Sequence, residues 1–132
     1  METTDTKKAR ILVVDDEQGF LDFIKEQLEL HDYVVLVARD GTEGLAGIKT
    51  NRPDLVICDI RMPKQDGFCV LKELRHSGDT KTPFIMVTAF DDFEKMKDAY
   101  SEEADFYLTK PVAMDTLLKN IQLLLSIKAN RL

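Results

Sequence analysis

Short apolar runs alternate along this chain with segments in which apolar residues recur at helical spacing. The runs are rich in β-branched and aromatic residues, as strands are, whereas apolar positions three and four residues apart predict helices. After the first run, for example, Phe20, Leu21, Phe23, Ile24 and Leu28 fall on one helical face. The pattern predicts five strands, at Ile11–Val14, Tyr33–Ala38, Leu55–Asp59, Phe84–Val87 and about 105–108.

Helix start and stop signals lie between these strands. Asp40 is a predicted N-cap for a helix that ends near Asn51, and Pro53 prevents its continuation. A loop with Asp66-Gly67 precedes a helix marked by Val70, Leu71 and Leu74. A weakly amphipathic segment follows at about 92–101, and the strongest helical pattern comes last, at Leu117, Leu118, Ile121, Leu124 and Leu125.

Five strand–helix units of this length need crossover connections, which make neighbouring strands parallel. The strands read as continuous apolar runs, as burial on both faces requires. The predicted fold is therefore α/β, a single five-stranded parallel sheet in a doubly wound (βα)5 arrangement. We predict one domain over residues 10–128, between a flexible segment at 1–9 and a tail at 129–132.

Composition narrows the functional classes. The 132 residues are 44% hydrophobic and 32% charged, as in ordinary globular domains, and the net charge of −6 argues against non-specific nucleic-acid binding. Cys58 and Cys69 form no metal-binding pattern, and Cys58 sits in an apolar run where we expect it to pack as a small hydrophobe. No signal peptide or transmembrane run is present, so we expect a cytoplasmic protein without membrane association.

Polar residues suited to phosphate and cations end four of the apolar runs. Asp15-Asp16, Asp59, Thr88 and Lys110 each follow or close one of them. In a parallel sheet the carboxyl ends of the strands share one edge, where ligands of open α/β sheets bind. Singly, each residue has a plain structural explanation as a helix cap, a strand end or a solvated lysine. Together they predict a binding site for phosphate and a cation at this edge of the sheet.

The chemistry of this set favours a magnesium ion and phosphoryl transfer. If the strand order is 2-1-3-4-5, Asp15, Asp16 and Asp59 would crowd together, and repulsion would disfavour their ionised forms unless a cation binds. Mg²⁺ prefers such oxygen ligands, while zinc would need the histidines or cysteines that this edge lacks. A lysine and a hydroxyl beside a nucleophilic carboxylate supply the positioning and charge neutralisation that phosphoryl transfer requires.

The whole set, in this order and spacing, resembles a response-regulator receiver domain of two-component signalling, of the chemotaxis-regulator type. The resemblance rests on the segments Val13–Glu17, Asp59–Pro63 with Asp66-Gly67, Val87–Ala89 and Tyr107–Pro111. It implies a flavodoxin-like strand order, 2-1-3-4-5.

The resemblance also implies a role for each residue. Asp59 would accept a phosphoryl group from a histidine kinase or histidine phosphotransfer protein. Asp16 and Asp59 would bind Mg²⁺ directly, Asp15 through water and Arg61 through its backbone carbonyl. The phosphoryl oxygens would contact Thr88 and Lys110. Tyr107 would change rotamer, switching the face of the fourth helix, fifth strand and fifth helix for a downstream partner or effector domain, or for a phosphorylation-dependent homodimer.

Two other readings stay open at this point. One is a receiver-like interaction module that works without phosphorylation, which the complete residue set disfavours. The other is a metabolic enzyme, such as a flavin protein or a phosphohydrolase. Arg61 stands two residues after Asp59, where a phosphohydrolase would need an acidic residue, and no tryptophan is available to stack on a flavin. We therefore expect self-phosphorylation and self-dephosphorylation at Asp59 rather than metabolic catalysis.

Overall fold

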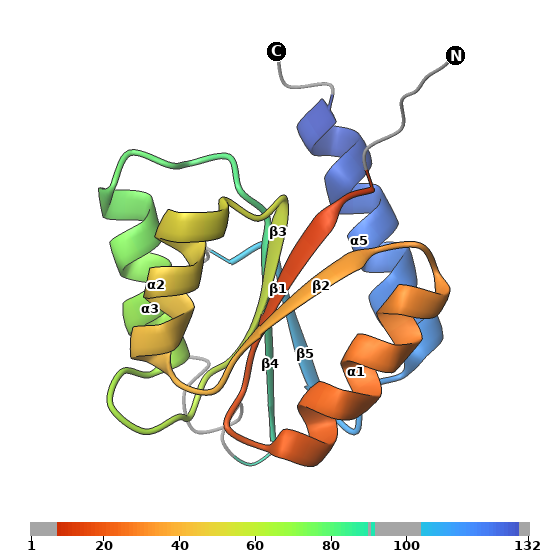
Figure 1. Cartoon of the computed structure of the whole chain (residues 1–132), viewed down its shortest axis with the longest axis horizontal. Helices are drawn as coiled ribbons and strands as arrows, with labels where there is room; N and C mark the ends of the chain where they lie inside the picture. Colours follow the sequence, from red (N-terminus) through yellow and green to blue (C-terminus); the bar gives the residue numbers. More distant parts are fainter. Residues whose placement is uncertain (1–7, 90, 92–103, 130–132) are drawn as a thin grey trace.

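Five parallel strands form one sheet in the order β2-β1-β3-β4-β5 (Figure 1). The computed structural model describes residues 8–89, 91 and 104–129. The strands are β1 (Arg10–Val14), β2 (Val34–Ala38), β3 (Leu55–Asp59), β4 (Phe84–Ala89) and β5 (Phe106–Lys110). The predicted fold class and strand order are confirmed.

Four described helices cover the two faces of the sheet. They are α1 (Gln18–Leu30), α2 (Gly41–Asn51), α3 (Gly67–His76) and α5 (Met114–Ala129). Figure 1 shows α1 and α5 on one face and α2 and α3 on the other. The N-cap predicted at Asp40 is confirmed, because its side chain accepts a hydrogen bond from the Glu43 amide, and Asp66 caps α3 in the same way. The helix predicted at 92–101 lies outside the described residues.

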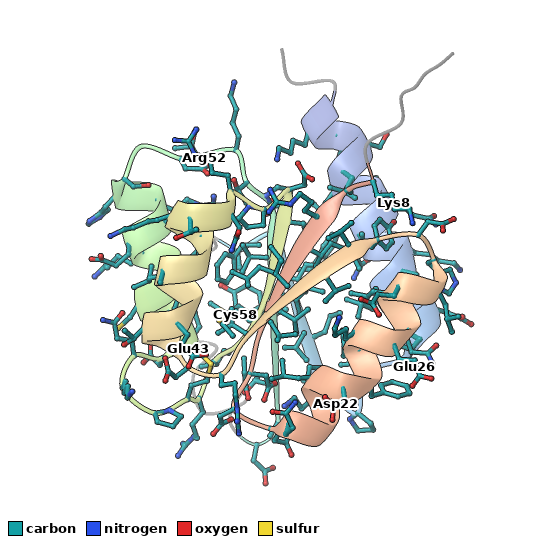
Figure 2. The ribbon with its side chains drawn as sticks, viewed as in Figure 1. Lys8, Asp22, Glu26, Glu43, Arg52 and Cys58 are labelled. Carbon is teal, nitrogen blue, oxygen red and sulfur yellow. The ribbon has the colours of Figure 1, made fainter. Side chains whose placement is uncertain are left out.

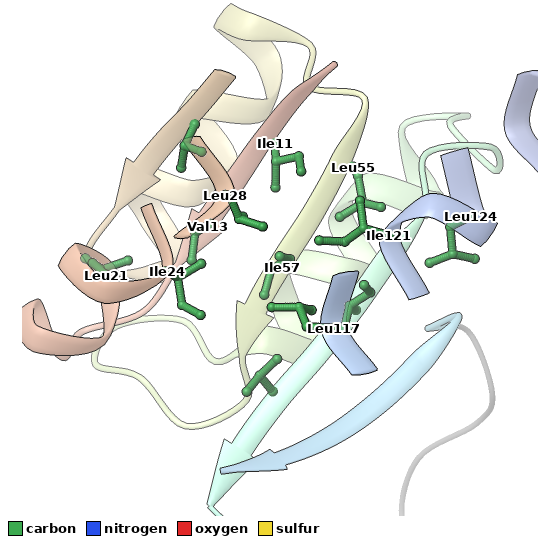
Figure 3. Packing of buried hydrophobic residues seen from close by; sticks show 13 residues of the cluster. Ile11, Val13, Leu21, Ile24, Leu28, Leu55, Ile57, Leu117, Ile121 and Leu124 are labelled. Atoms are coloured by element: carbon green, nitrogen blue, oxygen red, sulfur yellow. The ribbon is translucent and has the colours of Figure 1, made fainter. Parts of the chain in front are cut away.

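Apolar residues of the central strands fill two cores, one under each pair of helices. Figure 3 shows the core in which Leu21 and Ile24 of α1 and Leu117 and Ile121 of α5 pack on the sheet. The other core contains Cys58, which is fully buried as predicted (Figure 2). β3 is buried along its whole length, whereas the edge strand β2 exposes Val34 and Val37. Among the described helices, none is long and apolar enough to cross a bilayer.

The strand boundaries differ from the prediction on the functional side of the sheet. β4 continues to Ala89 and β5 to Lys110, because Thr88 pairs with Thr109 and Ala89 with Lys110. The predicted end of the fifth strand, near residue 108, was therefore wrong. Pairing between distant segments sets this boundary, and local hydrophobicity does not report it. Lys110 consequently belongs to the sheet ladder, which fixes its backbone.

Gly67 brings α3 against the end of β3. Its amide donates to the Ile60 carbonyl oxygen at 2.7 Å, and an added Cβ would collide with the Asp59 carbonyl oxygen. A residue with a side chain does not fit here. The start of α3 and the backbone of Asp59 are thereby held in one fixed relation.

Candidate functional site

The ends of β1, β3 and β5 bring Asp15, Asp59 and Lys110 together. Lys110 Nζ lies 2.8 Å from Asp15 Oδ2 and 3.4 Å from Asp59 Oδ2. These contacts join residues that are 95 and 51 positions apart in the chain. The predicted convergence of the acidic pair, Asp59 and Lys110 on one edge of the sheet is confirmed.

Asp15, Asp16 and Asp59 form an acidic cluster beside the lysine. One carboxylate oxygen of each lies within 4.8 Å of the others. The backbone fixes Asp15, whose amide donates to the Ala38 carbonyl oxygen at 3.0 Å and whose Oδ1 accepts from the Glu17 amide at 2.9 Å. In the described part of the chain, no histidine or cysteine joins the cluster. An all-oxygen donor set of this kind suits Mg²⁺.

Burial makes ionisation of the cluster costly. Burial, and secondly the charge of Asp15, raise the pKa of Asp59 to about 6, although Lys110, Thr88 and the Arg61 amide oppose the change. Burial also raises the pKa of Asp15, against the hydrogen bonds from Lys110 and the Glu17 amide. Both carboxylates are therefore less stable as anions than an exposed aspartate is. A bound divalent cation would offset this cost by neutralising the negative charge.

Thr88 presents a buried hydroxyl at the end of β4. Its side chain is 1% exposed, and Oγ1 makes no hydrogen bond of normal geometry with any described residue. The hydroxyl nevertheless lies near enough to the Asp59 carboxylate to oppose the rise in the pKa of Asp59. Buried polar atoms normally have a partner. An oxygen of a group bound at Asp59 would provide one.

An open cleft of about 580 Å³ leads from solvent to Asp59. Asp16, Arg61 and Lys110 line it together with Met62, Pro63 and Ala89. The Arg61 amide donates to Asp59 Oδ1 at 3.3 Å, which orients the carboxylate. Asp59 is 8% exposed and can therefore be reached through the cleft while most of its surface is covered.

Tyr107 lies apart from the cleft. It is half-buried among the residues under α2 and α3, and its ring stacks on Phe68 with centroids 6.4 Å apart and planes 30° apart. This is the position of a strand aromatic that packs on the core. Its role as a switch stays a prediction.

Sequence reasoning missed two residues that hold Lys110. Glu17 Oε1 lies 2.8 Å from Lys110 Nζ, and the Phe20 ring centroid lies 4.3 Å from the same nitrogen. Both belong to the turn that begins α1, and Glu17 directly follows the acidic pair, which was the available signal. The hydrogen bond to Lys110 lowers the pKa of Glu17. Burial alone would lower the pKa of Lys110, but Asp15, Glu17 and Asp59 outweigh it and raise the pKa.

Comparison with known proteins agrees with this geometry. The family described as the response regulator receiver domain matches residues 11–122. The response regulator MprA of Mycobacterium sp. (strain KMS) is 40% identical over 116 residues, which cover 88% of this chain and 50% of the relative. MprA of Mycobacterium ulcerans is 38% identical over the same length. The chain thus spans about half the length of the curated relatives it matches.

Solved structures show the same fold. The receiver domain of the Francisella response regulator 1452 is 35% identical, with a TM-score of 0.81 over 90% of this chain and 98% of that one. The Thermotoga maritima response regulator TrrA, solved in complex with Mg²⁺-BeF, is 34% identical, with a TM-score of 0.79 over 88% of this chain and 98% of that one. The chain belongs to the response regulator receiver domain family of two-component signalling systems.

Proposed function

We propose that this domain is a magnesium-dependent phosphoacceptor in which Asp59 takes a phosphoryl group from a phosphohistidine of a histidine kinase or histidine phosphotransfer protein. The observation that carries the proposal is the position of Asp59. Its carboxylate lines an open cleft, 3.4 Å from the Lys110 ammonium and within 4.8 Å of carboxylate oxygens of Asp15 and Asp16.

The acidic cluster is the proposed magnesium site. Asp16 and Asp59 would bind the ion directly, Asp15 through water and Arg61 through its backbone carbonyl. The raised pKa values of Asp15 and Asp59 support this assignment, because burial, and at Asp59 secondly the charge of Asp15, make the anions costly, and a bound cation would offset that cost. When bound, the ion would neutralise charge on the carboxylates and the incoming phosphoryl group. A related domain from Thermotoga maritima was solved in complex with Mg²⁺-BeF.

Transfer requires an in-line displacement at phosphorus. An Asp59 carboxylate oxygen forms the new bond to phosphorus, the phosphorus–nitrogen bond breaks, and its electron pair returns to the histidine ring. Lys110 and Thr88 would donate hydrogen bonds to the phosphoryl oxygens as their charge increases. Water entering the open cleft would attack the same phosphorus later, restoring the Asp59 carboxylate and releasing inorganic phosphate.

The output would be a change in the surface for protein partners. A hydrogen bond from Thr88 to the phosphoryl group would draw the end of β4 toward Asp59, and Tyr107 on the neighbouring strand would change rotamer. The face of the fourth helix, β5 and α5 would then favour a downstream partner or a second copy of the chain. The fourth helix of this proposal, at 92–101, lies outside the described residues.

Labelling with a small phosphodonor tests the proposal. The protein is incubated with acetyl phosphate or phosphoramidate, with Mg²⁺ or with EDTA, and intact mass spectrometry measures the phosphoryl adduct. We expect an adduct that requires Mg²⁺, is absent from Asp59→Asn, and persists in Asp79→Asn, a matched change at the opposite edge of the sheet. Absence of an adduct from the wild type would instead favour an interaction module that works without phosphorylation.

A further inference from the structure

Glu17 lies at the mouth of the cleft and contacts Lys110. No role in the local structure of α1 explains this contact. Glu17 occupies the N-cap position of α1, yet its side chain makes no capping hydrogen bond. Its carboxylate instead lies 2.8 Å from Lys110 Nζ, across 93 positions of sequence. The Glu17 side chain is 65% exposed, whereas that of Asp15, which contacts the same ammonium, is 1% exposed.

The ammonium of Lys110 has no donor left for a further partner. A lysine ammonium carries three N–H groups. Asp15, Glu17 and Asp59 each provide one carboxylate oxygen at hydrogen-bonding distance, at 2.8, 2.8 and 3.4 Å. The Phe20 ring lies 4.3 Å away, close enough for a cation–π contact. A phosphoryl oxygen can therefore bind Lys110 only if one carboxylate gives up its place.

We propose that Glu17 is a displaceable counter-ion that holds Lys110 at the mouth of the cleft in the resting protein and yields it to the phosphoryl group on Asp59. This inference rests on the proposed function. Asp15 cannot leave at low cost, because its buried carboxylate would lose a charged partner without gaining water. Glu17 is largely exposed, and its released carboxylate is hydrated at once. Phe20 keeps the ammonium in position during the exchange.

A second route would leave Glu17 in place. The contact between Lys110 and Asp59 is the longest of the three, and a phosphoryl group on Asp59 would inherit that donor if Glu17 stayed bound. The two routes differ in one measurable quantity. If Glu17 must leave, its carboxylate competes with the phosphoryl group and weakens the affinity of the site for it. If Glu17 stays, removing its contact changes nothing.

The test is a titration with beryllofluoride, whose fluorine atoms occupy the places of phosphoryl oxygens. Amide chemical shifts report binding to the wild type, Glu17→Gln, Glu17→Asp and Asp22→Asn at saturating Mg²⁺, verified separately for each protein. Glu17→Asp keeps the charge but withdraws it from Lys110 by one methylene. Asp22→Asn removes a carboxylate of the same helix that does not line the cleft.

We expect Glu17→Gln and Glu17→Asp to bind beryllofluoride roughly two- to fivefold more tightly than the wild type, the range for an exposed ion pair. The gain should shrink as salt rises, and Asp22→Asn should match the wild type. Equal affinities in all four proteins would overturn the proposal, and so would a Glu17→Asp protein that behaves as the wild type while Glu17→Gln binds more tightly. A wild type that binds no beryllofluoride would instead overturn the proposed function.

Discussion

The amino and carboxyl edges of the same sheet arrange their charges in opposite ways. At the amino edge, carboxylates fasten the first residues of strands. Asp54 Oδ2 accepts from the Arg10 amide at 2.7 Å, while Asp54 Oδ1 lies 3.7 Å from Lys128 Nζ. Asp105 Oδ2 accepts from the Phe84 amide at 2.8 Å. Figure 2 shows the labelled cations Lys8 and Arg52 at this end, opposite the labelled acids Asp22 and Glu43.

Asp79, before β4, is the clearest member of the amino edge. Its Oδ1 accepts from the amides of Lys81 and Thr82, both at 2.9 Å, and its Oδ2 accepts from the Thr82 hydroxyl. Burial acts to raise the pKa of Asp79, but these hydrogen bonds outweigh it and lower the pKa. The anion is more stable in the folded protein than in the unfolded one, so this aspartate stabilises the fold at neutral pH.

Asp59 at the carboxyl edge has the opposite balance. Its pKa rises to about 6 because burial and Asp15 outweigh the favourable contacts. Lys110 is shared among Asp15, Glu17 and Asp59, whereas at the amino edge each carboxylate has its own donors. The charges at the amino edge thus stabilise the fold, whereas at the carboxyl edge the buried carboxylates are costly to ionise, a cost that a bound metal ion would offset. Functional sites commonly lower stability in this way.

The largest expected change in the stability of the fold comes from a substitution at the carboxyl edge. Replacing Asp59 with Asn removes the charge and keeps the shape, so the metal-free fold should gain up to about 3 kcal/mol at neutral pH, the free energy that corresponds to a pKa raised from 3.8 to about 6. Urea unfolding in EDTA measures the change. A variant no more stable than the wild type would show that the charge of Asp59 is already compensated, and would break the contrast between the edges.

Magnesium should produce a gain of similar size in the wild type. At a concentration one hundred times its dissociation constant, a ligand that binds the folded state alone stabilises it by about 2.7 kcal/mol. Thermal melts with Mg²⁺ and with EDTA measure the gain, and Asp59→Asn should show a smaller one because a proposed ligand is altered. NaCl at equal ionic strength controls for general screening of charge. Identical wild-type midpoints at saturating Mg²⁺ would argue strongly against the metal site.

These effects depend on features that sequence patterns predict well. Continuous apolar runs identified the sheet, and Asp40 identified the start of α2, because an N-cap acts within one turn of helix. The carboxyl-edge set was predictable because parallel strands must end on the same side. The position of these residues follows from the strand topology alone, so the sequence was enough to predict it.

The rest depends on contacts between distant segments. Ladder pairing with β4, and not local hydrophobicity, carries β5 to Lys110. The partnership of Glu17 with Lys110 spans 93 positions, a separation that local patterns do not report. Tyr33 was predicted as a strand residue, but its amide bonds to the Leu28 carbonyl oxygen of the helix before it, and the strand starts one residue later. In the first two cases a contact between distant segments decides the outcome, whereas at Tyr33 the end of the preceding helix does.

The difference in stability between the wild type and Asp59→Asn should also depend on pH, by a somewhat smaller amount. The folded-state pKa of Asp59 lies above its unfolded value, so the folded protein takes up this proton first as the pH falls. Between pH 7.5 and 5 the metal-free wild type should therefore recover about 1.4 kcal/mol relative to Asp59→Asn. Glu17, Asp40 and Asp79, whose pKa values are lowered, destabilise both proteins as the pH falls. A difference between the two proteins that stays constant with pH would contradict the assignment.

The smallest expected effect comes from the same substitution at the opposite edge. Asp79→Asn loses the charge that strengthens its hydrogen bonds with Lys81 and Thr82, and should cost about 1 kcal/mol where Asp59→Asn is stabilising. Urea unfolding at neutral pH in EDTA measures both, and because the sites share no partner the double variant should show the sum of the two changes. If Asp79→Asn also stabilised the fold, the gain in Asp59→Asn would reflect relief of the overall net charge of −6 rather than anything particular to the carboxyl edge.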